Sequence, residues 1–554
     1  MVQSLDAFPS PRARLALATF TLGAYAQVAQ ALLVRETLLV FYGNEVSLGA
    51  FYGGWLLWVA VGAAAAVAVR GRAAGPRALS WLRRLLVLMP ALLAGQVLVI
   101  RTVRLWMDVP AVELVPFGQL LAATFLVTVP TGVAIGLAFP LACEALARPG
   151  SAGTDVTGRV ARGVEAVSRV YVLEAVGALA GGILFTFGLV GRVGPGQSLG
   201  LVSVALALVA LALGAARWVA LPVAALGLLV GLPPAGPALD RAMERERFRV
   251  LQPGLEWVTA VETRYGHTAV GRRGEQFSRV TDGRVSQSWP DLQGVAQEAA
   301  YFYSQAGAPR RVLLFGGLEG GLLAELLRYP VERVTAVEQD AAAFAQLRPY
   351  LEERTVSALA DPRLELVFGD GREVVNRLGD DADYDLVLVL GLDPSTAHSN
   401  RYFTVEFYRA LARRMTAPGG VLCTTVSSAS NYLGREVRTY GGSVYRTLGG
   451  VFAEVALAPG DTQVLCAGMG RGMVTSDPAV LEARYRAVPL AERHFPSDAF
   501  ADLLPPDRVA FVRASLEAEG GEWNTDDHPV AYYLNMVLWG KLTSPRVVGW
   551  LEAL

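Results

Sequence analysis

The chain has 554 residues, which is too long for one ordinary hydrophobic core, so we expect two or more domains. Apolar residues make up 53% of it and charged residues only 18%, which is too apolar for a soluble enzyme and too charged for a chain that lies in the membrane throughout. The net charge is −1 and the back half has no basic cluster, which argues against nucleic acid as a partner.

The charges divide the chain into two parts. Residues 1–235 carry 16 arginines and 9 acidic residues, whereas residues 236–554 carry 33 basic and 41 acidic residues. We therefore predict a transmembrane helical domain over 1–235, a polar linker over 236–254 and a soluble part after it.

The front part contains about seven apolar stretches, most of which reach or approach the roughly 20 residues that a helix needs to cross a bilayer. Two pairs of glycines, Gly132/Gly136 and Gly177/Gly181, have the spacing of four residues that lets helices pack closely in lipid. The stretches lie at about 15–34, 46–69, 85–100, 117–143, 170–191, 197–215 and 218–234.

Five ionisable residues lie in or beside these stretches, where such groups are either functional or held by a partner. Glu174 lies inside its stretch, and both roles are open there. For the other four we favour anchoring at the lipid headgroups, because they lie near the ends of their stretches: Arg35, Glu36, Glu45 and Glu144.

The three cysteines, Cys143, Cys423 and Cys466, are far apart in the sequence and lie in apolar runs. They indicate neither a disulfide framework nor a zinc site, so we expect buried free thiols. The four histidines are scattered, and we expect no metal centre.

The soluble part begins with alternating apolar and polar residues over 255–290, a pattern typical of a small antiparallel sheet. A short apolar strand follows at 311–315 and leads into the turn Gly316–Gly321. After a helix, a second strand ends at Glu338. Glycines let the backbone approach a ligand, and an acid at the end of the second strand can accept both hydroxyls of a ribose. The pattern indicates an adenosine-containing cofactor.

Two more strands end in acidic turns. One covers 364–368 and precedes Asp370, and the other covers 385–390 and precedes Asp393. Strands and helices alternate, which predicts a mainly parallel, doubly wound sheet with its ligand at the carboxyl ends of the strands. We expect Glu319, Glu338, Asp370 and Asp393 to converge there. The alternative for each is a turn or helix-cap residue.

These residues resemble the spermidine synthases, a family of aminopropyltransferases with the class I methyltransferase sheet, and most of all its bacterial branch with a multi-pass membrane domain in front. The resemblance covers about 255–470. The family's glycine-rich turn matches Gly316, Gly317, Glu319, Gly320 and Gly321, its ribose-binding acid matches Glu338, and its adenine-side pair matches Asp370 and Gly371. On the acceptor side the matches are Asp393, His267, Gln297, Glu298 and Tyr402.

One departure concerns the catalytic base. The family's aspartate that takes a proton from the attacking amine is replaced here by Leu390. Loss of a general base costs about 10²–10⁴-fold in rate. Asp393 could bind the amine or take over as base, and His267, Glu298 or a water molecule are weaker candidates.

The resemblance implies a membrane-bound transferase that moves an aminopropyl group from decarboxylated S-adenosylmethionine to a small or membrane-associated amine, without a metal. It also implies a Rossmann-like domain over 291–554 behind the small sheet at 255–290, and a homodimer, since the family tends to form one. Two alternatives stay open. One is a transferase that uses S-adenosylmethionine itself on a membrane-associated substrate, and the other is a non-catalytic ligand-sensing module.

The orientation follows from the arginines at 70–84 and 144–169, which the positive-inside rule places in the cytoplasm with the amino terminus. Seven crossings would put the soluble part outside the cell, where a nucleotide-derived cofactor is scarce. We therefore expect an inner (plasma) membrane protein with a cytoplasmic soluble domain, in which one apolar stretch does not cross fully or hides an irregular passage.

Overall fold

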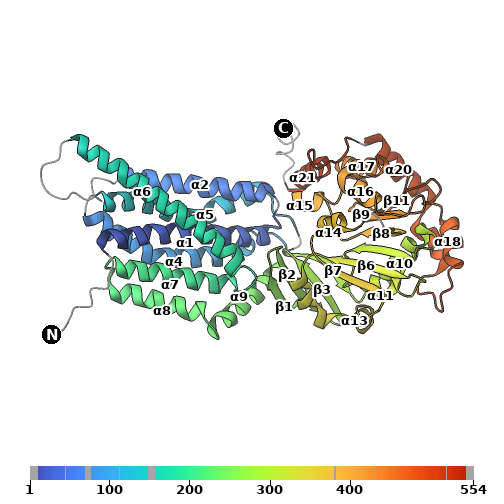
Figure 1. The fold of residues 1–554 in the computed structure, drawn as a ribbon, viewed down its shortest axis with the longest axis horizontal. Coiled ribbons are helices and arrows are strands. Elements are labelled where there is room, and N and C mark those ends of the chain that lie inside the picture. The colour runs from blue at the N-terminus through green and yellow to red at the C-terminus, as the bar shows by residue number, and fades with distance from the viewer. Residues whose placement is uncertain are drawn as a thin grey trace. The chain divides into compact units, whose positions relative to one another are not determined.

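The computed structural model describes residues 10–43, 45–68, 76–111, 113–147, 156–379, 382–430, 432–519 and 521–543. They fall into two compact units (Figure 1). The helical unit comprises residues up to Gly254 together with Glu262–His267, and the α/β unit comprises Leu255–Val261 and residues from Thr268 onward. Three arginines of the basic segments, Arg70, Arg72 and Arg148, lie outside the described residues.

The helical unit is a bundle of long apolar helices. Within the described ranges, six helices are long and apolar enough to cross a membrane, or seven if α8 and α9, which bend by 73° at their junction, form one broken span. The helices are α1 (Pro11–Phe41), α2 (Glu45–Ala68), α4 (Pro76–Trp106), α5 (Phe117–Leu146), α6 (Val156–Ile183), α7 (Pro195–Ala212), α8 (Arg217–Gly231) and α9 (Ala235–Leu251).

Small residues hold neighbouring helices together. A Cβ atom on Gly136 of α5 would lie 2.1 Å from the carbonyl oxygen of Val59 in α2. One on Gly177 of α6 would lie 2.0 Å from the carbonyl oxygen of Phe20 in α1. Only glycine fits at these two positions, so the close packing predicted from the glycine spacing is confirmed.

The chain enters the bundle at one end and leaves it at the other. At the first end, the Arg14 guanidinium of α1 donates to the carbonyl of Ala212 at the close of α7, over 3.5 Å. At the opposite end, Asp240 of α9 accepts from the backbone N–H groups of Gly196 and Gln197 at the start of α7, over 2.7 and 3.1 Å. Helix α8 therefore returns along α7, as Figure 1 shows.

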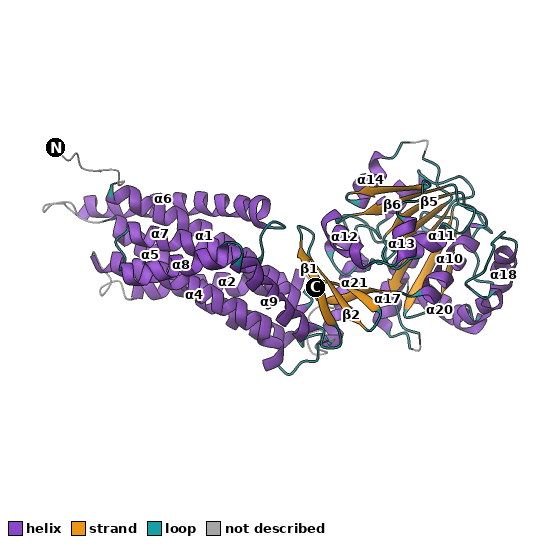
Figure 2. Cartoon of the chain, turned by 90° about the horizontal axis from the view of Figure 1, so that it is seen from below, coloured by secondary structure: helices purple, strands orange, loops and turns teal. Residues whose placement is uncertain are grey.

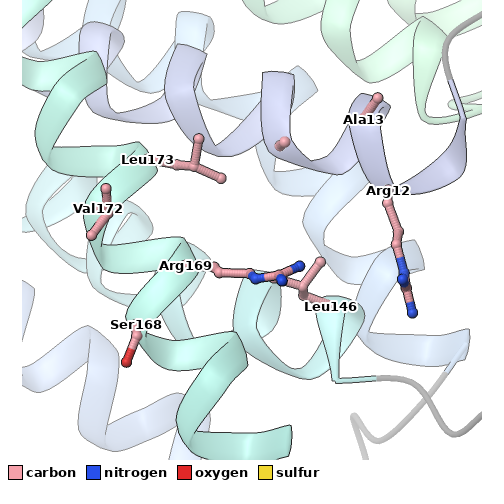
Figure 3. Close-up of a pocket in the computed structure, with 8 residues that line it drawn as sticks. Arg12, Ala13, Leu146, Ser168, Arg169, Val172 and Leu173 are labelled. Atoms are coloured by element: carbon pink, nitrogen blue, oxygen red, sulfur yellow. The ribbon is translucent and has the colours of Figure 1, made fainter.

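An open pocket of about 580 Å³ lies at the first end of the bundle (Figure 3). Its lining is apolar apart from Ser168 and two arginines, Arg12 of α1 and Arg169 of α6. Arg169 also pairs with Glu165, one turn earlier in the same helix, at 2.6 Å. This end of the bundle therefore carries basic side chains on two of its helices.

Ionisable residues at the opposite end form ion pairs. Glu36 is buried and receives hydrogen bonds from Arg101 of α4 and Arg247 of α9. Arg35 pairs with Glu262. The anchoring expected for Arg35 and Glu36 is therefore wrong, because both have acid–base partners inside the unit. Helix α9 itself occupies most of the predicted linker, and its Arg247 is buried through this pairing.

The α/β unit contains two sheets (Figure 2). The small one is antiparallel in the order β1-β2-β3-β4, with β1 (Glu256–Glu262), β2 (His267–Arg273), β3 (Gln276–Thr281) and β4 (Arg284–Trp289). The large one has seven strands in the order β10-β11-β9-β8-β5-β6-β7. They are β5 (Arg311–Phe315), β6 (Arg333–Glu338), β7 (Leu364–Phe368), β8 (Leu386–Val389), β9 (Val421–Ser427), β10 (Glu454–Ala458) and β11 (Thr462–Gly468).

Strands β5 to β9 are parallel, and β11 runs antiparallel to both β9 and β10. This confirms the mainly parallel sheet predicted from the alternation of strands and helices. The central strands are fully buried and form the core with the helices around them. These helices are α10 (Leu292–Ala306), α11 (Leu322–Leu326), α12 (Ala341–Leu347), α13 (Glu353–Ala358), α14 (Gly371–Arg377), α15 (Ala397–Asn400), α16 (Val405–Ala412), α17 (Arg435–Gly449), α18 (Pro478–Arg486), α19 (Phe500–Leu503), α20 (Pro506–Glu519) and α21 (Val530–Thr543).

Two of the three cysteines form a disulfide, Cys423–Cys466. The prediction of free thiols is therefore wrong for this pair. The two residues are 43 positions apart in the sequence, but the register of β9 and β11 places them directly opposite each other. Cys143 of α5 lies outside this disulfide.

Candidate active site

The candidate site lies at the carboxyl ends of four adjacent parallel strands, β8, β5, β6 and β7. Strand β5 pairs with β6 on one side and with β8 on the other, so the order of the sheet reverses there. A reversal of this kind leaves a crevice outside the strand ends, where α/β proteins bind their ligands. The turns that follow these four strands hold the four predicted acids.

The turn after β5 needs its glycines. Gly316, Gly317 and Gly321 have φ angles of +79°, +76° and +95°, which other residues rarely adopt. A Cβ atom on Gly316 would also lie 2.6 Å from the carbonyl oxygen of Leu390. The positive φ angles and this close approach account for glycine at these positions.

Glu338 ends β6 as a buried acid, with only 8% of its surface exposed. Its Oε1 accepts the N–H of Asp340 over 2.9 Å. Burial, and then the charge of Glu319, raise the pKa of Glu338 to about 7. The two acids therefore lie close enough to act on each other. Ionised Glu338 could accept two hydroxyl groups of a sugar.

Asp370 begins helix α14. Its Oδ1 accepts from the backbone N–H groups of Arg372 and Glu373 at 3.1 and 3.2 Å, and from Arg401 at 2.8 Å. Asp370 Oδ1 therefore caps helix α14, which is the alternative role given above for this acid. The hydroxyl of buried Tyr402 accepts the N–H of Gly371 over 3.1 Å, so Tyr402 supports the turn that presents Asp370.

Asp393 lies in the loop after β8, three residues beyond Leu390. Its Oδ1 accepts from the backbone N–H of Ser427 at 3.1 Å and from the hydroxyl of Tyr440. Burial, followed by the negative charge of Asp393, raises the pKa of Tyr440 well above its usual range, so the tyrosine stays a hydrogen-bond donor. Tyr440 was not singled out from the sequence.

The small sheet supplies two side chains that the sequence did not single out. Arg279 of β3 forms an ion pair with Glu319. Its cross-strand neighbour Gln287 of β4 reaches the same turn, because a Cβ atom on Gly320 would meet the Gln287 amide. The alternation of β3 and β4 was visible in the sequence. The sequence did not reveal which face of the small sheet lies over the glycine turn.

The remaining predicted residues lie elsewhere. His267 starts β2 and its Nε2 is 3.0 Å from Glu244 of α9, within the helical unit. Gln297 and Glu298 lie on the second turn of α10, with Glu298 exposed. Asp526, from the polar cluster near the carboxyl end, forms a double hydrogen bond with Arg372 at 2.7 and 2.8 Å and thus fastens helix α14.

Comparison with known proteins finds similarity in the part of the chain that carries this crevice. Residues 299–446 match the family model for the spermine/spermidine synthase domain. Polyamine aminopropyltransferase 2 of Ralstonia nicotianae is 31% identical over 338 residues, which cover 57% of this chain and 62% of that protein. The polyamine aminopropyltransferase of Korarchaeum cryptofilum is 36% identical over 116 residues, 21% of this chain and 35% of that protein.

The chain thus spans less than two thirds of either relative's length. A crystal structure of spermidine synthase with the transition-state analogue AdoDATO matches 47% of this chain and 88% of that chain, with 20% identity and a TM-score of 0.39. The family model and the named relatives agree on one family. The α/β part of this chain is therefore similar, over residues 299–446, to spermine/spermidine synthase domains.

Proposed function

We propose that this protein is a membrane-bound transferase of the spermidine synthase type, which moves an aminopropyl group from a sulfonium donor, decarboxylated S-adenosylmethionine, to an amine. The observation that carries the proposal is the arrangement of the bare glycine turn, buried Glu338 and hydrogen-bonded Asp393 at the ends of β5, β6 and β8. A sulfonium donor and an amine need an acidic crevice with a close backbone approach on one side, and these residues meet that need.

The cofactor side would be formed by the turns after β5, β6 and β7. The glycines Gly316, Gly317, Gly320 and Gly321 admit the donor, Glu338 accepts the ribose hydroxyls, and Asp370 with Gly371 borders the adenine. Glu319 faces the amino end of the donor. No metal is required, because the sulfonium already provides the leaving group.

The acceptor side would depend on Asp393. The attacking amine must be neutral, and polyamines arrive as cations, so a carboxylate has to hold the amine and remove a proton. Leu390 cannot do this, which leaves Asp393, held in place by Tyr440 and Ser427. His267, Gln297, Glu298 and Tyr402 stay proposed acceptor residues, with His267 engaged by Glu244.

A second candidate, transfer from S-adenosylmethionine itself, is favoured by one observation. Arg279 places a cation beside the amino end of the proposed donor site, where it pairs with Glu319. A guanidinium is a natural partner for the carboxylate that S-adenosylmethionine has and its decarboxylated form lacks.

We also propose that the helical unit is inserted in the inner (plasma) membrane as a multi-pass anchor that delivers a membrane-associated amine. Exposed leucines and aromatic side chains on its helices, such as Leu126 and Trp218, support contact with lipid. The same proposal includes a homodimer. It also divides the chain into domains at 1–235, 255–290 and 291–554, with the segment 236–254 as the linker.

The test is ligand binding and turnover by the full-length protein in detergent. We expect methylthioadenosine, which transfer of an aminopropyl-type group from either donor releases, to bind, and Glu338→Ala to abolish its binding. Glu332→Ala, which changes an exposed acid at the start of the same strand region, should leave binding unchanged. Absence of methylthioadenosine binding in the unmodified protein would instead support a module without this catalytic site.

A further inference from the structure

We propose that the donor is S-adenosylmethionine with its carboxylate intact, that Arg279 binds this carboxylate, and that the group transferred is 3-amino-3-carboxypropyl. This inference rests on the crevice and the carbon–sulfur cleavage of the proposed function, and it takes the donor of the second candidate in place of decarboxylated S-adenosylmethionine. It differs in the donor and therefore in the product.

Arg279 is placed in the crevice by the small sheet. Its cross-strand neighbour is Gln287, so both side chains project from the same face of the sheet. Gln287 approaches Gly320 and Arg279 pairs with Glu319, two adjacent residues of the glycine turn. Arg279 also lies near enough to Glu338 to lower its pKa, against the larger effect of burial. The guanidinium thus lies where the amino acid end of a donor would lie.

The guanidinium has hydrogen-bonding capacity left over. Nη1 donates to Oε1 of Glu319, whose side chain is 3% exposed, while that of Arg279 is 18% exposed. Its Nε is buried and has no hydrogen-bond partner among the described residues. A buried donor without a partner is costly, and the edge of a guanidinium that includes Nε fits a carboxylate. A bound carboxylate would satisfy it.

The local charges fit the carboxylated donor. Glu319, Glu338 and Arg279 sum to one negative charge when both acids are ionised. Decarboxylated S-adenosylmethionine carries two positive charges, on its ammonium and sulfonium groups, whereas S-adenosylmethionine adds a carboxylate and carries one. With the ammonium on Glu319 and the carboxylate on Arg279, each charge of the donor's amino acid end has an opposite partner. The decarboxylated donor has no carboxylate to offer Arg279.

The reaction balances without an oxidant or a reductant. The lone pair of the acceptor nitrogen attacks the γ-carbon of the methionyl chain and forms a C–N bond. The C–S bond breaks, and its electron pair neutralises the sulfonium, so methylthioadenosine leaves. The nitrogen loses its proton to Asp393 or to water. The carboxylate takes no part in these bond changes, so it can stay on Arg279 throughout.

A simpler role for Arg279 is that of a counter-ion that steadies Glu319. The two roles predict different patterns among ligands. A counter-ion would affect every ligand of the crevice to a similar extent. A carboxylate-binding arginine would affect only ligands that carry a carboxylate.

The experiment is calorimetric binding of three ligands to the full-length protein in detergent: methylthioadenosine, decarboxylated S-adenosylmethionine and S-adenosylmethionine. We expect S-adenosylmethionine to bind about 10–100-fold tighter than the decarboxylated form, the usual range for a hydrogen bond to a charged group. Arg279→Leu should remove this preference and, measured at about pH 9, where Glu338 is ionised with or without Arg279, leave methylthioadenosine affinity within about twofold. Arg279→Gln, which keeps a polar side chain but removes the charge, should do the same if the leucine variant fails to fold.

Arg272→Leu is the matched control, because Arg272 is an exposed arginine of the neighbouring strand β2. It should change none of the three affinities. Equal binding of the two donors, or an equal loss of all three ligands in Arg279→Leu, would overturn the proposal. Failure of methylthioadenosine to bind the unmodified protein would overturn the proposed function itself, and this inference with it.

Turnover gives a second readout. Incubated with S-adenosylmethionine and a set of amines, the protein should release methylthioadenosine and form an acceptor product that carries a carboxylate, detected by mass. Release of S-adenosylhomocysteine would show methyl transfer and would overturn the proposal. An aminopropyl product formed only from the decarboxylated donor would do so as well.

Discussion

Ionisation of Glu338 should favour ligand binding but lower the free energy of unfolding. Its pKa is raised to about 7 by burial and by Glu319, so the folded state holds this proton more tightly than the unfolded chain does. Between about pH 5 and pH 7 the unfolded chain releases the proton first, and the free energy of unfolding falls as pH rises. Ligand binding should change in the other direction, since ribose hydroxyls need the ionised acid.

We therefore expect methylthioadenosine affinity to rise about tenfold between pH 6 and pH 8, in step with the ionised fraction of a group of this pKa. Glu338→Gln should bind more weakly and show no such dependence. Its unfolding free energy should also lose the decline between pH 5 and 7. Calorimetry and thermal unfolding across this range measure both effects, and a flat profile in the unmodified protein would contradict the assignment.

Leu390 occupies the position of the family's catalytic base, and Asp393 is the acid proposed to act in its place. The carbonyl of Leu390 contacts the glycine turn, and its side chain is nearly buried, so an aspartate there would face the donor site. We expect Leu390→Asp to raise transfer to polyamines by about 10–100-fold, part of the usual contribution of a general base. Asp393→Asn should lower turnover by a similar factor with methylthioadenosine binding retained. Release of methylthioadenosine measures both, and no gain from Leu390→Asp would locate the acceptor pocket elsewhere.

At the scale of elements, the sequence predicts what is local and misses what depends on register. The strand at 311–315, the glycine turn and the terminal acid of β6 are visible because a short apolar run, glycines and a charge occur within 28 residues. The pairing of Cys423 with Cys466 and the approach of Arg279 to Glu319 depend on which residues face each other across strands, and no local pattern records that. For Asp370 the two interpretations of the sequence are compatible, since its oxygen caps a helix and also borders the crevice.

The disulfide between β9 and β11 should stabilise the α/β unit by limiting the unfolded chain. A bond that closes a loop of this size contributes roughly 2–4 kcal/mol. We expect Cys423→Ala with Cys466→Ala to lower the unfolding midpoint, and the reductant sensitivity of the unmodified protein to disappear in this variant. Cys143→Ala is the control, since this cysteine is not part of the disulfide and its removal should leave the reductant sensitivity in place. Equal midpoints with and without reductant in the unmodified protein would speak against the bond.

The contact of α6 with α1 offers a test of helix packing. A Cβ atom on Gly177 would collide with the carbonyl of Phe20, so Gly177→Ala should separate the helices and lower the thermal midpoint in detergent. Gly163→Ala, in the same helix but with no atom within 4 Å of the added Cβ, should leave the midpoint unchanged or raise it slightly. A similar shift in both variants would rule out packing as the cause.

At the scale of the molecule, the direction of the helices bears on orientation. Arg14 lies beside the end of α7 and Asp240 beside its start, so the first helix begins at one end of the bundle and α9 lies at the other. With the basic end in the cytoplasm, the chain that follows α9 is expected outside. The disulfide agrees, because such bonds persist in oxidising compartments. This expectation differs from the cytoplasmic location that the cofactor suggested.

Reporters fused to either terminus test it. We expect a cytoplasmic reporter to be active at the amino end only, and a reporter that needs export to be active at the carboxyl end only. A membrane-impermeant thiol reagent applied to intact cells after mild reduction should label Cys423 and Cys466 and spare Cys143. Activity of the cytoplasmic reporter at both ends would place the α/β unit inside the cell.

If α8 and α9 form a seventh, broken span, the chain that follows α9 lies on the far side of the membrane from the amino terminus, and this bears on the supply of the donor. A transferase beyond the membrane cannot draw on the donor pool in the cytoplasm, where adenosyl sulfonium compounds are made. Its throughput would be limited by export of the donor. Its spent methylthioadenosine would be released beyond the reach of intracellular salvage. Comparing intact cells with lysed cells, each given external donor, would show directly which pool the enzyme uses.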